Sequence, residues 1–427
     1  MTTSLRAQMA RLRASRLARD AALLFALNLT SRALGFVGSL YAARCLGPVK
    51  LGISGVVQAA VQQAGLAYNG GLDPVGVRRI ATDPAHAPGV AGAISRFRFL
   101  AAMALGLVWT VVVLLVEPPG GRTVWLLGVP LLLATALNLT YVFQGLERLP
   151  LQNAITTGGA LLSALAYLLL FRPGAFLGAD LIVLGGATAA VALASWIAYR
   201  RVTGHWPLGG GQRGLLPGLL RESWRYWLLT GVVFLYASYQ VPFVAYFADV
   251  RAAGWYRAAM TLAAGLELLY NSVNSLLLPR LVRWHSVGVG YMWERQQELL
   301  RVFLVVGVAV TAVVILVAPP VFRRVLGPEF GPAILAFQLL AVARTVAFWG
   351  QIFAWGLTAS KQDAAYLLAS SLGVVCSLPL NLAVVGRWGI LGVAAVSIVS
   401  ECVVNGACFL LMRRHATRWP APAARAP

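Results

Sequence analysis

Long apolar runs, separated by short polar stretches, dominate the pattern of the whole chain. Each run is close to the roughly 20 apolar residues that a helix needs to cross the hydrocarbon core of a bilayer. The runs lie near residues 21–43, 51–72, 99–116, 123–143, 152–171, 176–199, 226–247, 253–278, 302–318, 331–357, 364–385 and 388–412. The pattern therefore predicts an all-α integral membrane protein with about 12 transmembrane helices.

Composition and charge agree with that prediction. Of the 427 residues, 59% are hydrophobic and only 11% are charged, whereas soluble domains carry about 25% charged residues. The net charge of +21 would suit a nucleic-acid partner. However, the basic residues lie between apolar runs and form no basic domain, so we interpret them as topology signals and expect no nucleic-acid partner.

The distribution of arginine and lysine predicts the orientation in the membrane. With a cytoplasmic N-terminus, 24 of the 35 basic residues fall on the cytoplasmic side and nine on the other. The basic segment 1–20 precedes an apolar run that is too long for a signal-peptide core, so we expect this run to be retained. Together with an even number of spans, these features predict two cytoplasmic termini.

The two halves of the chain resemble a repeat. Asn69, Pro74 and Arg78 correspond to Asn274, Pro279 and Arg283 at a constant offset of 205 residues. Further pairs match in order, among them Arg200-Arg201 with Arg413-Arg414. A parallel repeat of two pseudo-symmetric six-helix bundles around a central cavity is a design that transporters use. We expect a basic N-terminus at 1–20, bundles at 21–205 and 223–412, a linker at 206–222 and a disordered tail at 413–427.

Arg32 lies at the middle of the first predicted span. A central arginine costs about 2.5–3.5 kcal/mol on insertion scales, so it usually faces a cavity or a partner. Asn28, one turn earlier, makes the same face polar. Arg32 is a candidate phosphate or diphosphate clamp, because a guanidinium binds phosphate oxygens bidentately. The alternative is a structural arginine paired with a carboxylate or with carbonyl groups.

Amide side chains recur on one face of the second predicted span. Gln58, Gln62 and Asn69 follow helical spacing. The eighth predicted span carries similar amide side chains, Asn271 and Asn274. Amides suit sugar hydroxyls, since each offers donors and an acceptor. The alternative function of each single amide is hydrogen bonding between helices.

Other candidates are intramembrane charges and aromatic side chains. Glu267 aligns with Gln62, and it could pair with Arg32 or Arg344 or carry a proton. Glu401 could instead neutralise Arg344. Tyr239 could stack on a sugar ring. The predicted substrate-binding set is Arg32, Asn28, Gln58, Gln62, Asn69, Tyr239, Glu267, Asn271, Asn274 and Arg344.

The sequence contains no enzyme signature such as HExxH or GxSxG, and no metal-spaced cluster of histidine and cysteine. The four cysteines form no CxxC pair and lie within or beside apolar runs, so we expect free thiols. We therefore predict a transporter with no catalytic residue, no metal and no cofactor.

The opening SRALGFVGSLYAARCLGPVKLGISG, residues 31–55, and the segment FQGLERLPL, residues 143–151, carry a family resemblance. They resemble the polysaccharide exporters, the O-antigen flippase-like branch of the multidrug/oligosaccharidyl-lipid/polysaccharide (MOP) flippase superfamily. The lipid II flippases of that superfamily share the opening but carry a further arginine where this chain has Gly38. The resemblance thus implies a substrate other than lipid II.

The resemblance implies a flippase that moves an undecaprenyl-diphosphate-linked oligosaccharide across a bacterial cytoplasmic membrane by alternating access. It implies membrane lipids as surroundings, glycosyltransferases or a glycan polymerase as partners, and a monomeric protein. The chief alternative is a cation-coupled multidrug exporter of the same superfamily. A membrane glycosyltransferase or polymerase would need a long catalytic loop, which this chain lacks. A scaffold without transport activity remains a third alternative.

Overall fold

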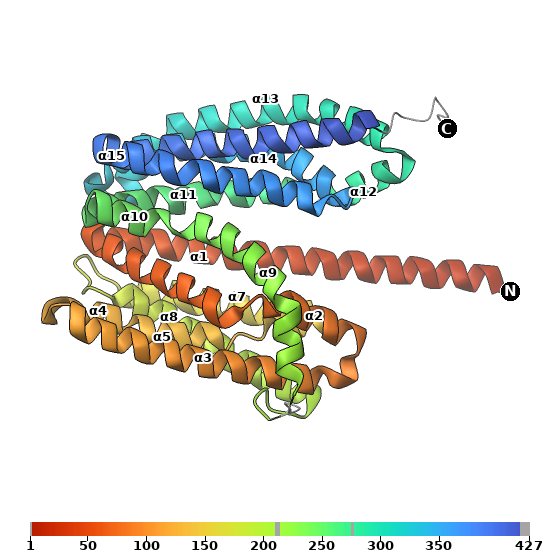
Figure 1. Ribbon diagram of the computed structural model, residues 1–427, viewed down its shortest axis with the longest axis horizontal. Coiled ribbons are helices and arrows are strands. Elements are labelled where there is room, and N and C mark those ends of the chain that lie inside the picture. Colours follow the sequence, from red (N-terminus) through yellow and green to blue (C-terminus); the bar gives the residue numbers. More distant parts are fainter. Residues whose placement is uncertain (1, 210–213, 275–276, 419–427) are drawn as a thin grey trace. The chain divides into compact units, whose positions relative to one another are not determined.

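The structure is a computed structural model that contains only helices and connecting segments in the part of the chain it describes (Figure 1). It describes residues 2–209, 214–274 and 277–418, although side chains at the start of the chain and at some positions within helices are not included. The chain divides into two compact units. Unit 1 comprises residues 1–42 and 60–230, and unit 2 comprises residues 43–59 and 231–427.

The first helix, α1, contributes to both units. It covers Thr2–Asn69 and contains one non-helical residue, Gly47, with φ 73°. This left-handed conformation costs glycine little, and the following Pro48 lacks the N–H that would continue the helix. The Gly47-Pro48 break therefore separates the predicted first and second spans, and the segment 43–59 belongs to unit 2.

Unit 1 continues with helices that run alongside one another (Figure 1). They are α2 (Leu72–Thr82), α3 (Ala87–Val116), α4 (Pro119–Leu126), α5 (Gly128–Ala136), α6 (Thr140–Gly145), α7 (Leu149–Leu170) and α8 (Ala179–Thr203), with a short 3-10 turn η1 (Pro84–His86) before α3. Helix α9 (Leu215–Ser238) begins in unit 1, inside the stretch predicted as a linker, and ends in unit 2.

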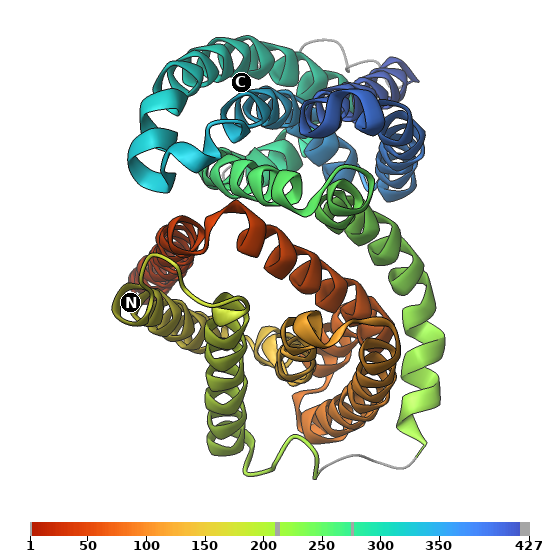
Figure 2. The same cartoon turned by 90° about the vertical axis from the view of Figure 1, so that its left-hand side faces the viewer.

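The helices of unit 2 are shown nearly end-on in Figure 2. They are α10 (Gln240–Phe247), α11 (Val250–Asn274), α12 (Leu277–Val287), α13 (Val289–Val321), α14 (Ala333–Ala359) and α15 (Asp363–Arg418), with two short turns, η2 (Phe322–Leu326) and η3 (Pro328–Phe330), between α13 and α14. Helix α15 is interrupted at Gly389, at the start of the last predicted span.

Seven helical segments of the described chain are long and apolar enough to cross a membrane, and one of them, Pro119–Gly145, is made by α4, α5 and α6 together. They contain the predicted spans from 99 to 199 and from 302 to 412. The remaining predicted spans lie on α1, α9, α10 and α11, which are helical. The all-helical membrane protein is thus confirmed, and the count of twelve spans stays a prediction.

One predicted span is not a continuous helix. The range 123–143 is divided among α4, α5 and α6. Pro130 has no N–H to donate to the carbonyl group of Leu126, which favours the break between α4 and α5. The Asn138 side chain accepts hydrogen bonds from the backbone N–H and the hydroxyl of Thr140, and this local arrangement competes with the helix between α5 and α6.

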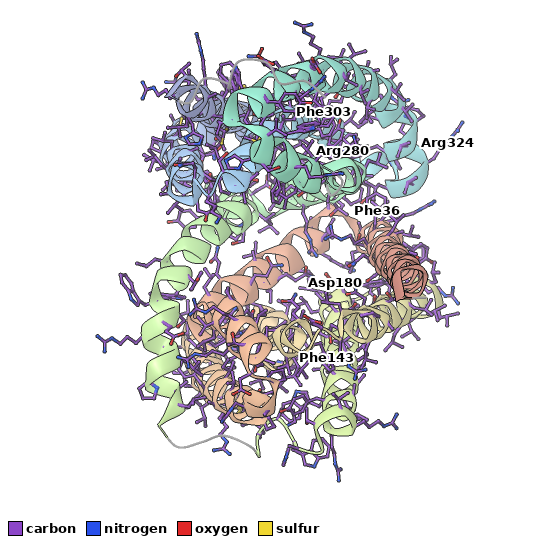
Figure 3. All side chains as sticks on the ribbon, turned by 90° about the vertical axis from the view of Figure 1, so that its right-hand side faces the viewer. Phe36, Phe143, Asp180, Arg280, Phe303 and Arg324 are labelled. Atoms are coloured by element: carbon purple, nitrogen blue, oxygen red, sulfur yellow. The ribbon has the colours of Figure 1, made fainter. Side chains whose placement is uncertain are left out.

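Each unit has its own apolar core. Phe143 belongs to the buried cluster of unit 1, and Phe303 to that of unit 2 (Figure 3). Large apolar side chains also lie on the outside of the spans, such as Leu115, which is 80% exposed, and Leu316, which is 76% exposed. Water would disfavour such surfaces, whereas lipid chains solvate them.

Candidate transport site

Arg32 lies on α1 in unit 1, and its side chain is exposed. No hydrogen bond or ion pair joins it to any of the side chains that the structure describes. Asn28, one turn earlier, is exposed as well and has an interaction within the described chain. Among the described side chains nothing occupies the Arg32 guanidinium, so its N–H groups are available to an anion.

The predicted amide face of residues 58–69 is divided between the units. Gln58 belongs to unit 2, whereas Gln62 and Asn69 belong to unit 1. Gln62 is exposed. Gln58 accepts a hydrogen bond from Arg257 at 2.8 Å, and Asn69 donates to Asp73 at 3.2 Å. Two of these three amides therefore have partners within their own unit.

Asn69 belongs to a polar cluster of unit 1 that the sequence did not predict. The buried Arg98 donates to the Asn69 amide oxygen and, at 2.6 Å, to the Asp73 carboxylate. Its guanidinium also lies 5.0 Å from the centre of the Tyr141 ring. Arg98 directly precedes the predicted span 99–116 and is one of the basic residues interpreted as topology signals, but it joins α2, α3 and α6 with the end of α1.

Arg257 is a second arginine whose role the sequence did not predict. It lies on α11, one turn inside the predicted span 253–278, and it is partly buried. It donates to the Leu51 carbonyl and to Gln58, both at 2.8 Å. It thereby attaches the segment 43–59 to the rest of unit 2. The only sequence signal was its distance of one turn from the predicted start of the span.

Three charged side chains from different helices of unit 2 lie near one another, and one of them, Glu267, is exposed. Arg344 on α14 and Glu401 on α15 line a cavity of about 90 Å³, together with Gln240, Met260, Leu340, Ala343 and Ser397. Glu267 on α11 lies with its Oε2 atom 4.0 Å from Arg344 Nε. Of the two partners considered for Glu267, the structure places Arg344 beside it.

The charges of this cluster do not cancel. One arginine and two glutamates carry a formal charge of −1. Arg344 Nε is buried and makes no hydrogen bond to the side chains described, while Glu401 accepts one from Asn405 at 3.4 Å. An unsatisfied donor and an excess carboxylate within a membrane-spanning unit are costly. The cluster is therefore able to bind a proton or another cation, and Arg344 is able to exchange one carboxylate partner for the other.

Tyr239 and Gln240 follow the end of α9. The Tyr239 hydroxyl accepts a hydrogen bond from Asn381 and donates one to Ser377 at 3.4 Å, so it contacts α15. Gln240 accepts from Tyr256 at 2.8 Å. The stacking of Tyr239 on a sugar stays a prediction. The side chains of Asn271 and Asn274 lie outside the described residues, so their predicted role stays a prediction as well.

No group of three histidine, cysteine, aspartate or glutamate side chains within the described chain is close enough to hold a metal ion. The cysteines at 45, 376, 402 and 408 are all free thiols.

A family profile described as "Polysaccharide biosynthesis protein" matches residues 17–285. The chain belongs to this family. The match covers α1 from residue 17 onward, α2 to α11 and most of α12, and it confirms the family that the opening motif indicated. No curated protein matches the chain at a significant level.

Solved structures share the fold of this family member over nearly its whole length. A multidrug resistance MATE family transporter of the MOP superfamily, in an inward-facing conformation, aligns with TM-score 0.71 and 15% identity, over 91% of this chain and 95% of that one. The lipid II flippase MurJ, in an inward closed conformation, aligns with TM-score 0.75 and 10% identity, over 92% of this chain and 87% of that one.

A MOP superfamily transporter from Pyrococcus furiosus, whose binding pocket is described as having reverse polarity, aligns with TM-score 0.60 and 14% identity. The alignment covers 93% of this chain and 95% of the transporter chain. At these identities the likeness establishes the fold alone. The chain shares that fold with these MOP superfamily transporters.

Proposed function

We propose that this protein is a flippase that moves a lipid-linked oligosaccharide, carried on undecaprenyl diphosphate, across the bacterial cytoplasmic membrane. The observation that carries the proposal is the polysaccharide biosynthesis family match over residues 17–285 in a chain with a MOP transporter fold. Transport proceeds by alternating access between bundles 21–205 and 223–412 around a central cavity. Both termini are cytoplasmic, and the protein acts as a monomer beside glycosyltransferases or a glycan polymerase.

The exposure of Arg32 supports the proposal that the substrate carries a phosphate group. Its exposed guanidinium has no partner among the described side chains, and it lies within an apolar stretch of α1. A planar guanidinium can bind two oxygens of one phosphate group at once. Asn28 and Gln62, also exposed on α1, offer donors and acceptors to sugar hydroxyls. The lipid tail of the substrate stays in the bilayer.

The membrane potential supplies a driving force for such a substrate. An inside-negative potential favours outward movement of an anion by about 2.3 kcal/mol per charge per 100 mV. Two diphosphate charges would gain roughly 4–5 kcal/mol at that potential. A dedicated coupling ion is therefore not required by the energetics.

A cation-coupled multidrug exporter is the second candidate function. The excess carboxylate in the cluster of Glu267, Arg344 and Glu401 favours it, because that cluster can take up a cation. Such an exporter would need a site for cationic drugs, whereas Arg32 and Arg44, both exposed on α1, are positively charged.

The experiment that separates the two candidates is gene inactivation with a leaflet assay. Loss of a flippase leaves lipid-linked glycan on the cytoplasmic leaflet and reduces surface polysaccharide. A gain in drug sensitivity with normal glycan distribution would instead support the multidrug exporter. Transport in vesicles that is indifferent to an imposed potential would contradict the proposed driving force.

A further inference from the structure

A depression lies at the end of helix α8, outside every residue assigned to transport. Its volume is about 390 Å³, and it is lined by Ile197, Arg200, Arg201 and Trp206. On the predicted topology, this end of α8 is at the cytoplasmic surface of the membrane. A tryptophan at that level is typical of the membrane interface.

The lining combines positive charge with apolar surface. The Arg200 guanidinium lies 4.6 Å from the centre of the Trp206 ring, which orients it by a cation–π interaction. Arg201 adds a second guanidinium, and none of the four lining residues is acidic. Such a depression favours a ligand with a negatively charged group.

The loop that carries Trp206 is fixed to the helices of unit 1. Gly204 ends α8 with φ 75°, and its N–H donates to the Arg200 carbonyl at 2.8 Å. Farther along, Arg96 of α3 donates to the Leu208 carbonyl at 2.7 Å. These bonds anchor the backbone on either side of Trp206, and the contact with Arg200 places the ring beside α8.

An apolar strip of α8 leads to the arginines. Leu193 is 60% exposed and Ile197 is 41% exposed. Both share a helical face with Arg201, because residues four apart are neighbours on a helix. A molecule with an acyl chain along Leu193 and Ile197 would present its phosphate group to Arg200 and Arg201.

We propose that this depression binds the head group of an anionic membrane phospholipid, with its acyl chain along Leu193 and Ile197. Basic pockets at the cytoplasmic ends of transmembrane helices can hold such head groups. The inference is independent of the transported substrate, since none of its residues belongs to the candidate transport site. Arginines at a helix C-terminus also stabilise the helix dipole, and the test separates this effect from lipid binding.

The test counts lipids retained by the purified full-length protein in native mass spectrometry, during titration with phosphatidylglycerol or with phosphatidylcholine. For the double variant Arg200→Gln/Arg201→Gln, we expect affinity for phosphatidylglycerol to fall on the order of tenfold, with little change for phosphatidylcholine. Ile197→Ser should weaken phosphatidylglycerol binding as well. The matched control is Arg413→Gln/Arg414→Gln, two exposed arginines near the end of α15, and it should bind like the wild type.

Four results would overturn the proposal. The first is equal binding by the wild type and the Arg200→Gln/Arg201→Gln variant. The second is an equal loss in the control at Arg413 and Arg414, which would indicate a general charge effect. The third is a pair of observations: millimolar inorganic phosphate displaces phosphatidylglycerol, and Ile197→Ser leaves phosphatidylglycerol binding unchanged. Together they would indicate a site for soluble phosphate. The fourth is a fall in thermal stability of the Arg200→Gln/Arg201→Gln variant that is the same in phosphatidylglycerol and in phosphatidylcholine, which would indicate only a structural role for the two arginines.

Discussion

Arg98 Nη2 lies 2.6 Å from Asp73 Oδ1 and joins α3 to α2 inside unit 1. The arginine side chain is 5% exposed, whereas the aspartate is 44% exposed. The buried partner therefore depends on this contact more than the exposed one does, because Asp73 keeps access to solvent. The Arg98 guanidinium also lies 5.0 Å from the centre of the Tyr141 ring and donates to Asn69, so Arg98 connects four helices, α1, α2, α3 and α6.

Replacing Arg98 should destabilise unit 1. We expect Arg98→Ala to lower the free energy of unfolding by about 1–3 kcal/mol, because it removes a charged hydrogen bond and buried packing. The measurement is the thermal unfolding midpoint of the purified protein in detergent. Arg148→Ala, at an exposed arginine of the same unit, should change the stability by no more than about 0.5 kcal/mol. Equal effects of the two changes would contradict the assigned role.

The transport prediction concerns Arg32. Arg32→Ala should abolish glycan transport while the protein still inserts, because the exposed guanidinium is the proposed phosphate clamp. Arg32→Lys should keep part of the activity, since lysine supplies the charge without the bidentate geometry. The measurement is lipid-linked glycan on each leaflet, alongside the amount of protein in the membrane. Arg387→Ala, at an exposed arginine of unit 2, serves as the control, and wild-type transport by Arg32→Ala would assign that residue a structural role.

The charges in unit 2 should act as a coupled set. Arg344→Ala leaves Glu267 and Glu401 without the arginine near them and should reduce folded yield. Adding Glu267→Gln to that variant should restore part of the yield, because it removes one of the two stranded carboxylates. A double-mutant cycle on the unfolding midpoint should give a coupling energy of about 0.5–3 kcal/mol. Additive effects would show that the 4.0 Å contact between Glu267 and Arg344 contributes nothing.

A close approach of two backbones inside unit 2 leads to a packing prediction. A Cβ atom on Gly254 of α11 would collide with the backbone of Pro48, and one on Gly52 would collide with that of Val250. Small residues allow membrane helices to pack this closely. Gly254→Ala should therefore lower the folded yield severalfold, as measured by size-exclusion chromatography. Gly406→Ala, where a Cβ would meet no atom within 4 Å, should leave the yield unchanged.

The helices were predictable because their signal is local. Twenty apolar residues in sequence favour a membrane-spanning helix whatever lies beside it, and α7, α8 and α14 match their predicted ranges closely. The break within 123–143 was not predicted, because an apolar run hides the local hydrogen bonds of Asn138.

The pairing of polar groups was less predictable, because partners come from distant parts of the chain. Arg98 and Asp73 are close in sequence, yet their contact depends on the reversal of the chain between α2 and α3. Gln58 and Arg257 are separated by 199 residues. Counting charges for topology treats such arginines as loop residues, since it contains no information on which helices meet.

Glu222 supplies a prediction about pH. Its carboxylate accepts hydrogen bonds from Arg79 and, at 2.9 Å, from Arg78, and these bonds attach the start of α9 to α2. The bond from Arg79 is the main cause that lowers the pKa of Glu222 below its ordinary value of 4.5. A carboxylate with a lowered pKa in the folded protein stabilises that state above the pKa of the unfolded chain.

The stabilisation by Glu222 should therefore be present at neutral pH and disappear in acid. We expect the difference in unfolding midpoint between the wild type and Glu222→Gln to stay constant from pH 7 to about 5. It should then shrink as the pH falls through and below 4.5, where the carboxylate becomes protonated. High salt should reduce the difference as well, since all three side chains are partly exposed to solvent. Glu294→Gln, at an exposed glutamate elsewhere, is the control, and a difference for Glu222→Gln that persists undiminished at pH 3 would show that the contact stabilises the fold by packing and not by charge.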